Sequence, residues 1–398
     1  MINPSINGWI DKFFLENQSN FKDYSDYESF YTDLRKSGFI YGHPITIVLK
    51  NSIDLSGLSL DEITKIAFLN TLYTVFCIKT KETDTLLFLK SVNSFYKSIQ
   101  KENYNFLTKL LPSASKSSQL ESIINDRIQT NQNVVTKSFS HIVINAMLFL
   151  DVLGYYQYIH QEDHTEKYLK DFESSCMKVV SLTFKIKNNK TKYDELLIKL
   201  FENSLRYSKL QNIDTLTIEE INFTKFQTLI EKLYILDLVE MAVWSDTKLD
   251  IKELNFLEII IEKLQLNILF LNESLFTIED FIMTNKDEIS YFNFSNPVKH
   301  FYDQTNKTVS KLINRNKKRL IKEISESKEL MVLLAKSTTK ELDKDEKKKV
   351  KKQLLDICKT IPSLTIFLLP GGGILLPILV KYIPQLLPSA FNENLEED

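Results

Sequence analysis

Two histidines, His160 and His164, are the first residues whose types and spacing could do chemistry. Side chains four positions apart on a helix share one face, so both imidazoles could reach one metal ion, with Asp163 or Glu166 completing the site. The intervening Gln-Glu-Asp places the glutamate one position off the H-E-x-x-H metalloprotease pattern. The segment also follows Gly154, and we favour a polar loop over a metal site.

Three carboxylates around position 250 form a second candidate site. Asp246, Asp250 and Glu253 fall between an apolar stretch at 226–244 and a second helix expected to start at position 251. Asp250 and Glu253 have the spacing of a capping box, in which each side chain accepts a backbone N–H of the other residue. Carboxylate oxygens also suit Ca²⁺ or Mg²⁺. We favour the cap and keep a divalent cation as the alternative.

The rest of the sequence contains no recognisable enzyme signature. No Gly-Lys-Ser/Thr phosphate-binding loop occurs, and Gly371–Gly373 has neither an expected strand before it nor a lysine after it. Cys77, Cys176 and Cys358 are odd in number and widely spaced, which favours buried thiols over disulfides or a metal site. We therefore predict that the protein is not an enzyme. We predict no cofactor apart from the divalent cation that Asp246, Asp250 and Glu253 would bind under the alternative above.

The elements that position these residues are expected to be helices. Five of the 9 prolines and three of the 8 glycines lie after position 360. The preceding chain is rich in helix formers, and hairpin signals are nearly absent. We predict an all-α fold with a multi-helix body, a C-terminal basic helix and a proline-broken apolar helical segment. The predicted regions are 1–220, 221–296 and 297–398.

Charge is segregated along the chain. The formal charge is −2, yet residues 307–359 hold 17 Lys or Arg against 8 Asp or Glu, a net of +9. Within them lies a basic neck, which comprises Lys347, Lys348, Lys349, Lys351 and Lys352. A near-neutral total argues against a globally basic nucleic-acid binder, and no DNA partner is expected. A basic patch beside apolar sequence favours anionic lipid.

The basic neck leads into a long apolar segment. Asp343 and Glu346 can cap the helix that carries the neck. Its apolar positions on one face are Val350, Leu354, Ile357 and Ile361. Residues 361–380 then run for 20 positions without a charge, the lower end of what spans a bilayer. Prolines and glycines interrupt any helix there, so we expect two short apolar pieces.

The hairpin that ends at Glu253 resembles the core of tellurite-resistance (TerB-like) domains. Their pattern is an apolar helix followed by Asp-Gly-x-x-x-x-x-Glu. Asp246 and Glu253 match this pattern, and Thr247 replaces the glycine. The resemblance implies that these acids bind a divalent cation.

The segment from Asp343 onward is similar to the start of the conserved region of Letm family proteins (leucine-zipper, EF-hand-containing transmembrane proteins). In both, a charged helix leads through a basic patch into an apolar stretch with Leu-Leu-Pro, a Lys, a Pro and a closing Leu-Pro-Ser-x-Phe. The landmarks here are Leu376, Pro377, Lys381, Pro384, Leu387, Pro388, Ser389 and Phe391. The other breakers are Pro362, Pro370, Gly371, Gly372 and Gly373. The chain also resembles bacterial Letm-related proteins labelled biofilm-associated.

This resemblance implies a non-enzymatic, membrane-associated protein that acts in cation homeostasis or in membrane-linked ribosome binding or assembly. Organelle members continue into a domain that resembles a ribosome-binding fold, which this chain is expected to lack. No secretory signal is visible at Met1–Ser5, so we expect the body on the cytoplasmic side of the inner membrane. We expect membrane lipids as partners, and the ribosome or another protein as a further partner. The alternative is a soluble helical interaction module whose apolar segment, 361–387, packs on its own body.

Overall fold

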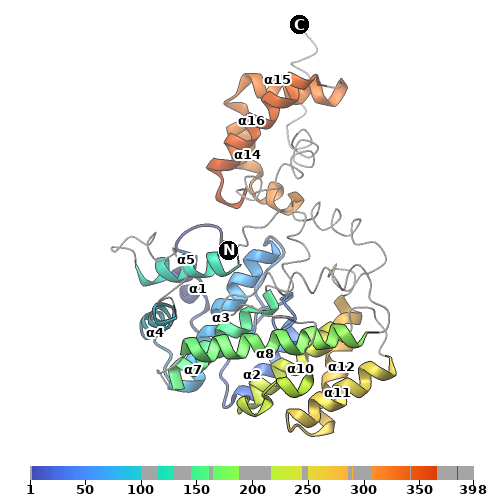
Figure 1. The fold of residues 1–398 in the computed structure, drawn as a ribbon. Coiled ribbons are helices and arrows are strands. Elements are labelled where there is room, and N and C mark those ends of the chain that lie inside the picture. The colour runs from blue at the N-terminus through green and yellow to red at the C-terminus, as the bar shows by residue number, and fades with distance from the viewer. Residues whose placement is uncertain are drawn as a thin grey trace. The chain divides into compact units, whose positions relative to one another are not determined.

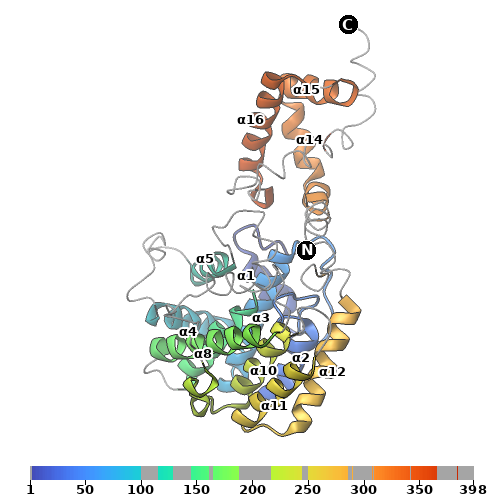
Figure 2. The ribbon, with the colours of Figure 1, turned by 45° about the vertical axis from the view of Figure 1, so that its right-hand side comes forward.

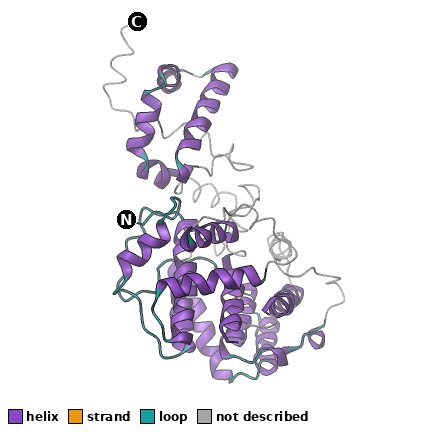
Figure 3. Cartoon of the chain, turned by 90° about the vertical axis from the view of Figure 1, so that its left-hand side faces the viewer, coloured by secondary structure: helices purple, strands orange, loops and turns teal. Residues whose placement is uncertain are grey.

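The structure is a computed structural model, and the residues that it describes are helical or lie in loops. Those residues are 2–99, 115–128, 145–160, 165–187, 217–243, 250–285, 289, 307, 309–340, 342–364 and 383. They contain no β-strand (Figure 3), and one isolated antiparallel bridge joins Phe21 to Leu49. The predicted all-α fold is confirmed.

The helices follow one another along the chain with these bounds: α1 (Trp9–Asn17), α2 (Tyr27–Ser37), α3 (Leu60–Thr80), α4 (Thr85–Ser98), α5 (Lys116–Ile128), α7 (Leu148–His160), α8 (Thr165–Ile186), η2 (Ile218–Glu220), η3 (Phe223–Lys225), α10 (Leu229–Val243), α11 (Ile251–Lys263), α12 (Ile268–Asn285), α14 (Lys317–Ser325), α15 (Lys328–Thr339) and α16 (Lys344–Thr360). Two compact units divide them. The first comprises Met1–Ile53, Leu60–Gln129 and Phe139–Pro297, and the second comprises Asp54–Ser59, Thr130–Ser138 and Val298–Asp398.

The first unit is built around helices that pack side by side. Helix α8 lies along α7 and α10, and α3 packs on α7 (Figure 1). Phe14, Tyr73 and Phe88 form an edge-to-face cluster with ring centroids 5.0 to 5.9 Å apart. Such aromatic pairs contribute about 0.5–1.5 kcal/mol each beyond the burial of their area. Distant segments of the sequence therefore share one aromatic core.

Two glycines of the first unit are required by their surroundings. Gly38 ends α2 with a φ of 80°, and a Cβ there would collide with the backbone oxygen of His43. Gly154 lies inside α7, where a Cβ would stand 2.7 Å from Leu169 of α8. Helix α7 continues past Gly154 to His160, and the missing side chain of this glycine lets α7 and α8 approach closely.

The second unit is a small helical core. Helices α14, α15 and α16 pack on one another (Figure 2). The buried residues between them, together with those from neighbouring segments, are Val309, Leu312, Ile313, Leu320, Ile324, Leu330, Leu333, Leu334, Leu342, Val350, Leu354, Ile357, Cys358, Ile361, Leu364 and Ile383. Removing apolar surface from water stabilises a fold by about 25 cal/mol per Å². The burial of these side chains therefore holds the three helices together.

Candidate functional site

Helix α16 positions the basic neck and begins at a well-formed cap. Asp343 accepts the backbone N–H of Glu346 at 2.8 Å, and the Glu346 side chain accepts the N–H of Asp343 at 3.0 Å. Both interactions of the predicted capping box are therefore present. The cap fixes where the helix starts, and thus which side of it each following lysine occupies.

The buried and charged residues of α16 lie on different sides. Val350, Leu354 and Ile357 are buried as predicted, together with Cys358. Successive residues turn by about 100° around a helix axis, which gathers the exposed lysines of one side into what we call the lysine face. It comprises Lys344, Lys348, Lys351, Lys352 and Lys359. A rigid helix thus presents several positive charges in one direction.

Ion pairing distinguishes Lys349 from three other lysines of the neck. Lys349 contacts Glu329 of α15 at 2.8 Å, and hydrogen bonding to Lys349, followed by its charge, lowers the pKa of Glu329. Lys348, Lys351 and Lys352 make no ion pair with any carboxylate in the described part of the chain. After the hydrogen bond and charge of Lys359, the charge of Lys352 also lowers the pKa of Asp356, four positions along the helix. All three lysines are exposed, so an external anion can reach them.

Polar contacts hold the other two helices in place against α16. Ser327 caps α15 and donates its hydroxyl to Gln353 of α16 at 2.8 Å. Arg319 of α14 donates to the carbonyl oxygen of Thr360 at 2.7 Å. Exposed basic residues of α14 add to the charge: Lys317, Lys318, Arg319 and Lys322. The unit is thus a scaffold with basic residues on more than one helix.

Only part of the predicted C-terminal motif lies within the described residues. Pro362 is exposed in a short turn after α16. Outside the described residues lie Pro370, Gly371, Gly372, Gly373, Leu376, Pro377, Lys381, Pro384, Leu387, Pro388, Ser389 and Phe391. No helix of the described chain is both long and apolar enough to cross a membrane.

The described residues of the apolar segment are mostly buried in the second unit. Ile361, Leu364 and Ile383 are between 0 and 1% exposed and belong to the core formed with α14, α15 and α16. Ser363 accepts a hydrogen bond from Asn316 at 2.8 Å. These side chains contribute to the folding of the unit.

The carboxylates near position 250 form the predicted cap. Asp250 accepts the N–H groups of Lys252 and Glu253 at 2.8 and 2.9 Å, and Glu253 accepts the N–H of Asp250 at 2.9 Å. Asp246 lies outside the described residues. Within the described ranges no group of three His, Cys, Asp or Glu side chains could hold a metal ion. The capping box is confirmed, and the cation stays a prediction.

The histidine pair is likewise only partly described. His160 is the last residue of α7, its Nδ1 lies 2.7 Å from the carbonyl oxygen of Tyr156, and burial lowers its pKa. His164 lies outside the described residues. The cysteines differ in burial: Cys176 and Cys358 are buried, whereas Cys77 is half-buried, and all three are free thiols.

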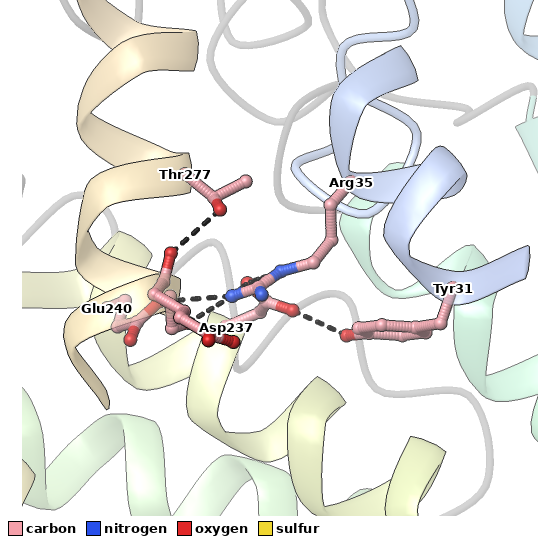
Figure 4. A network of polar contacts seen from close by, with 7 residues as sticks. Tyr31, Arg35, Asp237, Glu240 and Thr277 are labelled. Atoms are coloured by element: carbon pink, nitrogen blue, oxygen red, sulfur yellow. Dashed lines mark hydrogen bonds and ion pairs between the residues drawn. The ribbon is translucent and has the colours of Figure 1, made fainter. Parts of the chain in front are cut away.

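Sequence reasoning missed a buried ionic network in the first unit (Figure 4). Arg35 of α2 donates two hydrogen bonds to Asp237 of α10 at 2.8 and 3.0 Å, and Tyr31 donates to the same carboxylate at 2.5 Å. Glu240 accepts the hydroxyl of Ser274 at 2.6 Å and lies 3.6 Å from Arg35. The available signal was the pair Asp237 and Glu240, three positions apart and the two charged residues in the run 233–243, which is otherwise apolar or aromatic.

Comparison with known proteins supports the Letm resemblance. Residues 342–398 match the family model described as "LETM1-like, RBD". No curated protein and no solved structure matches the chain. The matched region begins at the capping box of α16, carries the basic neck and covers the whole predicted motif. The C-terminal region is therefore similar to LETM1-like proteins, and the biofilm-associated type and the TerB-like hairpin stay predictions.

Proposed function

We propose that this chain is a non-enzymatic, Letm-like protein that binds ribosomes through the lysine face of α16. The single observation that carries the proposal is the set Lys348, Lys351 and Lys352, exposed on one capped helix without an ion pair to the described carboxylates. The match to a family model whose description includes "RBD" covers this same helix. We read that abbreviation as ribosome-binding domain.

Ribosomal RNA is a suitable counterpart for such a face. Its phosphates are densely spaced, and lysines that neutralise them release condensed counterions, which makes the affinity strongly dependent on salt. Lysine acts as a point charge and reads no sequence at phosphate groups. The proposed contact is therefore electrostatic and sequence-independent.

Co-sedimentation of the full chain with ribosomes over a range of salt concentrations tests the proposal. The variant K348E/K351E/K352E is expected to bind more weakly and to lower the slope of log affinity against log salt by about 3, since each phosphate contact contributes about 1. The matched control, K90E/K97E/K263E, reverses three exposed lysines of the first unit. Equal binding by the two variants would contradict the proposed interface.

We further propose that binding takes place at the cytoplasmic face of a membrane. The uncharged run 361–380 and the neighbouring lysines support this location. Flotation with vesicles that contain anionic lipid tests it, because a peripheral protein is released by high salt whereas an anchored one requires detergent. Cation homeostasis, also implied by the resemblance, has no further support among the described residues and stays a prediction.

The second candidate function is a soluble interaction module whose apolar C-terminus packs on its own chain. The burial of Ile361, Leu364 and Ile383 in the core of the second unit favours it. Under this alternative the full-length protein stays out of the lipid fraction at every salt concentration. Flotation at low salt therefore separates the two candidates.

A further inference from the structure

Three large apolar side chains are exposed in a row on α12. Leu269, Phe276 and Met283 are 61, 72 and 60% exposed. Their spacing of seven residues aligns them along the helix, on the side that faces away from buried Leu271 and Ile278. Figure 2 shows α12 at the edge of the first unit. We call these three residues the α12 stripe.

Acidic residues flank this stripe. Glu273, Glu279 and Asp280 are all exposed on α12, beside the three apolar side chains. Over residues 250–285, which include α11 and α12, seven acids stand against two lysines, a net charge of −5. The stripe is therefore an apolar row within a strongly acidic surface. This negative charge favours a binding partner whose own surface is positively charged.

We propose that the α12 stripe binds a basic amphipathic helix of a partner protein. Such a helix lays its apolar side along the stripe and directs lysine or arginine to the flanking carboxylates, as in helix-in-groove recognition. Leu269 and Met283 are 14 positions apart, which at a rise of 1.5 Å per residue is about 21 Å. A partner helix of about 15 residues covers that length.

The same charges disfavour two other occupants. Two copies that paired stripe to stripe would bring like charges together, which is unfavourable across an interface. An anionic membrane would repel Glu273, Glu279 and Asp280, whereas helices that lie on membranes have basic polar faces. Charge complementarity therefore selects a basic helix.

The test uses the full chain and two labelled synthetic peptides, each roughly 18 residues long and helical. Both carry leucines at heptad positions, and their remaining positions are lysine in one peptide and glutamate in the other. Fluorescence anisotropy is expected to show binding of the lysine peptide alone. Since aromatic anchors dominate such contacts, L269S/F276S is expected to weaken binding at least tenfold. The control L15S/L86S changes two equally exposed leucines, 71 and 73% exposed, on other helices and is expected to have no effect.

Charge reversal separates this proposal from non-specific adhesion. E273K/D280K is expected to lose the lysine peptide and to gain the glutamate peptide. Equal binding of both peptides, or equal weakening by L15S/L86S, overturns the proposal. It is also overturned if L269S/F276S abolishes a dimer in light scattering, abolishes binding to anionic vesicles, or lowers the melting temperature as loss of a buried aromatic does. Those results would assign the stripe to a second copy, to lipid or to the protein's own chain.

Discussion

At the scale of single residues, two buried carboxylates compete for one guanidinium. Asp237 and Glu240 are both fully buried beside Arg35. Arg35 is hydrogen-bonded to Asp237 and stands 3.6 Å from Glu240, so Asp237 is the better compensated anion. Burial raises the pKa of Glu240 to about 8, and the neighbouring charge of Asp237 adds to this rise against the opposing effect of Arg35. Glu240 is thus the residue that carries the proton at neutral pH.

This proton makes stability depend on pH. The unfolded chain releases it near the ordinary glutamate pKa of 4.5, whereas the folded protein keeps it up to about pH 8. The free energy of unfolding should therefore fall as the pH rises between these values, by at most about 1.4 kcal/mol per pH unit for one proton. E240Q keeps a neutral side chain and is expected to remove this fall.

Urea unfolding of the parent and of E240Q at pH 6, 7 and 8 measures the effect. The informative quantity is the stability difference between the two proteins, which should move in favour of E240Q as the pH rises. D237A serves as a contrast, because it removes the main partner of buried Arg35 and should cost about 3–5 kcal/mol. A difference between parent and E240Q that stays constant over this range contradicts the assignment of the proton.

Capping pairs could be predicted from the sequence, whereas the buried ion pair could not. The capping partners of Asp250 and Asp343 lie three positions away, so local spacing was sufficient to predict them. Arg35 and Asp237 are about 200 positions apart, and only the packing of α2 on α10 brings them together. Long-range polar pairs depend on the tertiary structure, which helical periodicity does not specify.

At the scale of elements, apolar periodicity locates the helices but does not reveal that α10 is surrounded by other helices. The apolar residues of Leu60–Cys77 recur at helical spacing, and this stretch lies within α3, which extends to Thr80. The apolar stretch at 226–244 contains α10 (Leu229–Val243), which is preceded by two short 3₁₀ turns. Most of α10 is buried on all sides because α2, α8, α11 and α12 surround it. Apolar periodicity identifies one buried face, and it does not reveal how many neighbours a helix has.

The cap of α11 gives a prediction at the same scale. D250A removes the side chain that accepts the N–H groups of Lys252 and Glu253, and is expected to lower the stability of the first unit by about 1 kcal/mol. Thermal unfolding measures this loss, and D250N, which keeps a capping oxygen, is expected to recover most of it. Calorimetry with Ca²⁺ and Mg²⁺ tests the cation alternative. Binding that D246A abolishes would show that the turn does more than cap the helix.

At the scale of the whole molecule, the apolar C-terminal segment contributes to the core of its own unit. Deletion of residues 361–398 would remove Ile361, Leu364 and Ile383 from that core. A deleted protein that leaves the membrane fraction could therefore do so because the second unit has unfolded. Point substitutions on the lysine face leave the core intact, which is why they are the better test of membrane and ribosome binding.

The division into two compact units leads to the last prediction. Leu236 of α10 and Leu354 of α16 are 0 and 1% exposed, so replacing either with alanine should cost about 2–5 kcal/mol. Both tryptophans of the chain belong to the first unit, so tryptophan fluorescence follows that unit alone, whereas circular dichroism follows all helices. L236A should lower the melting temperature by fluorescence. L354A should change only the dichroism transition, because the second unit has its own core, and an equal fluorescence shift in L354A would mean that the two units unfold together.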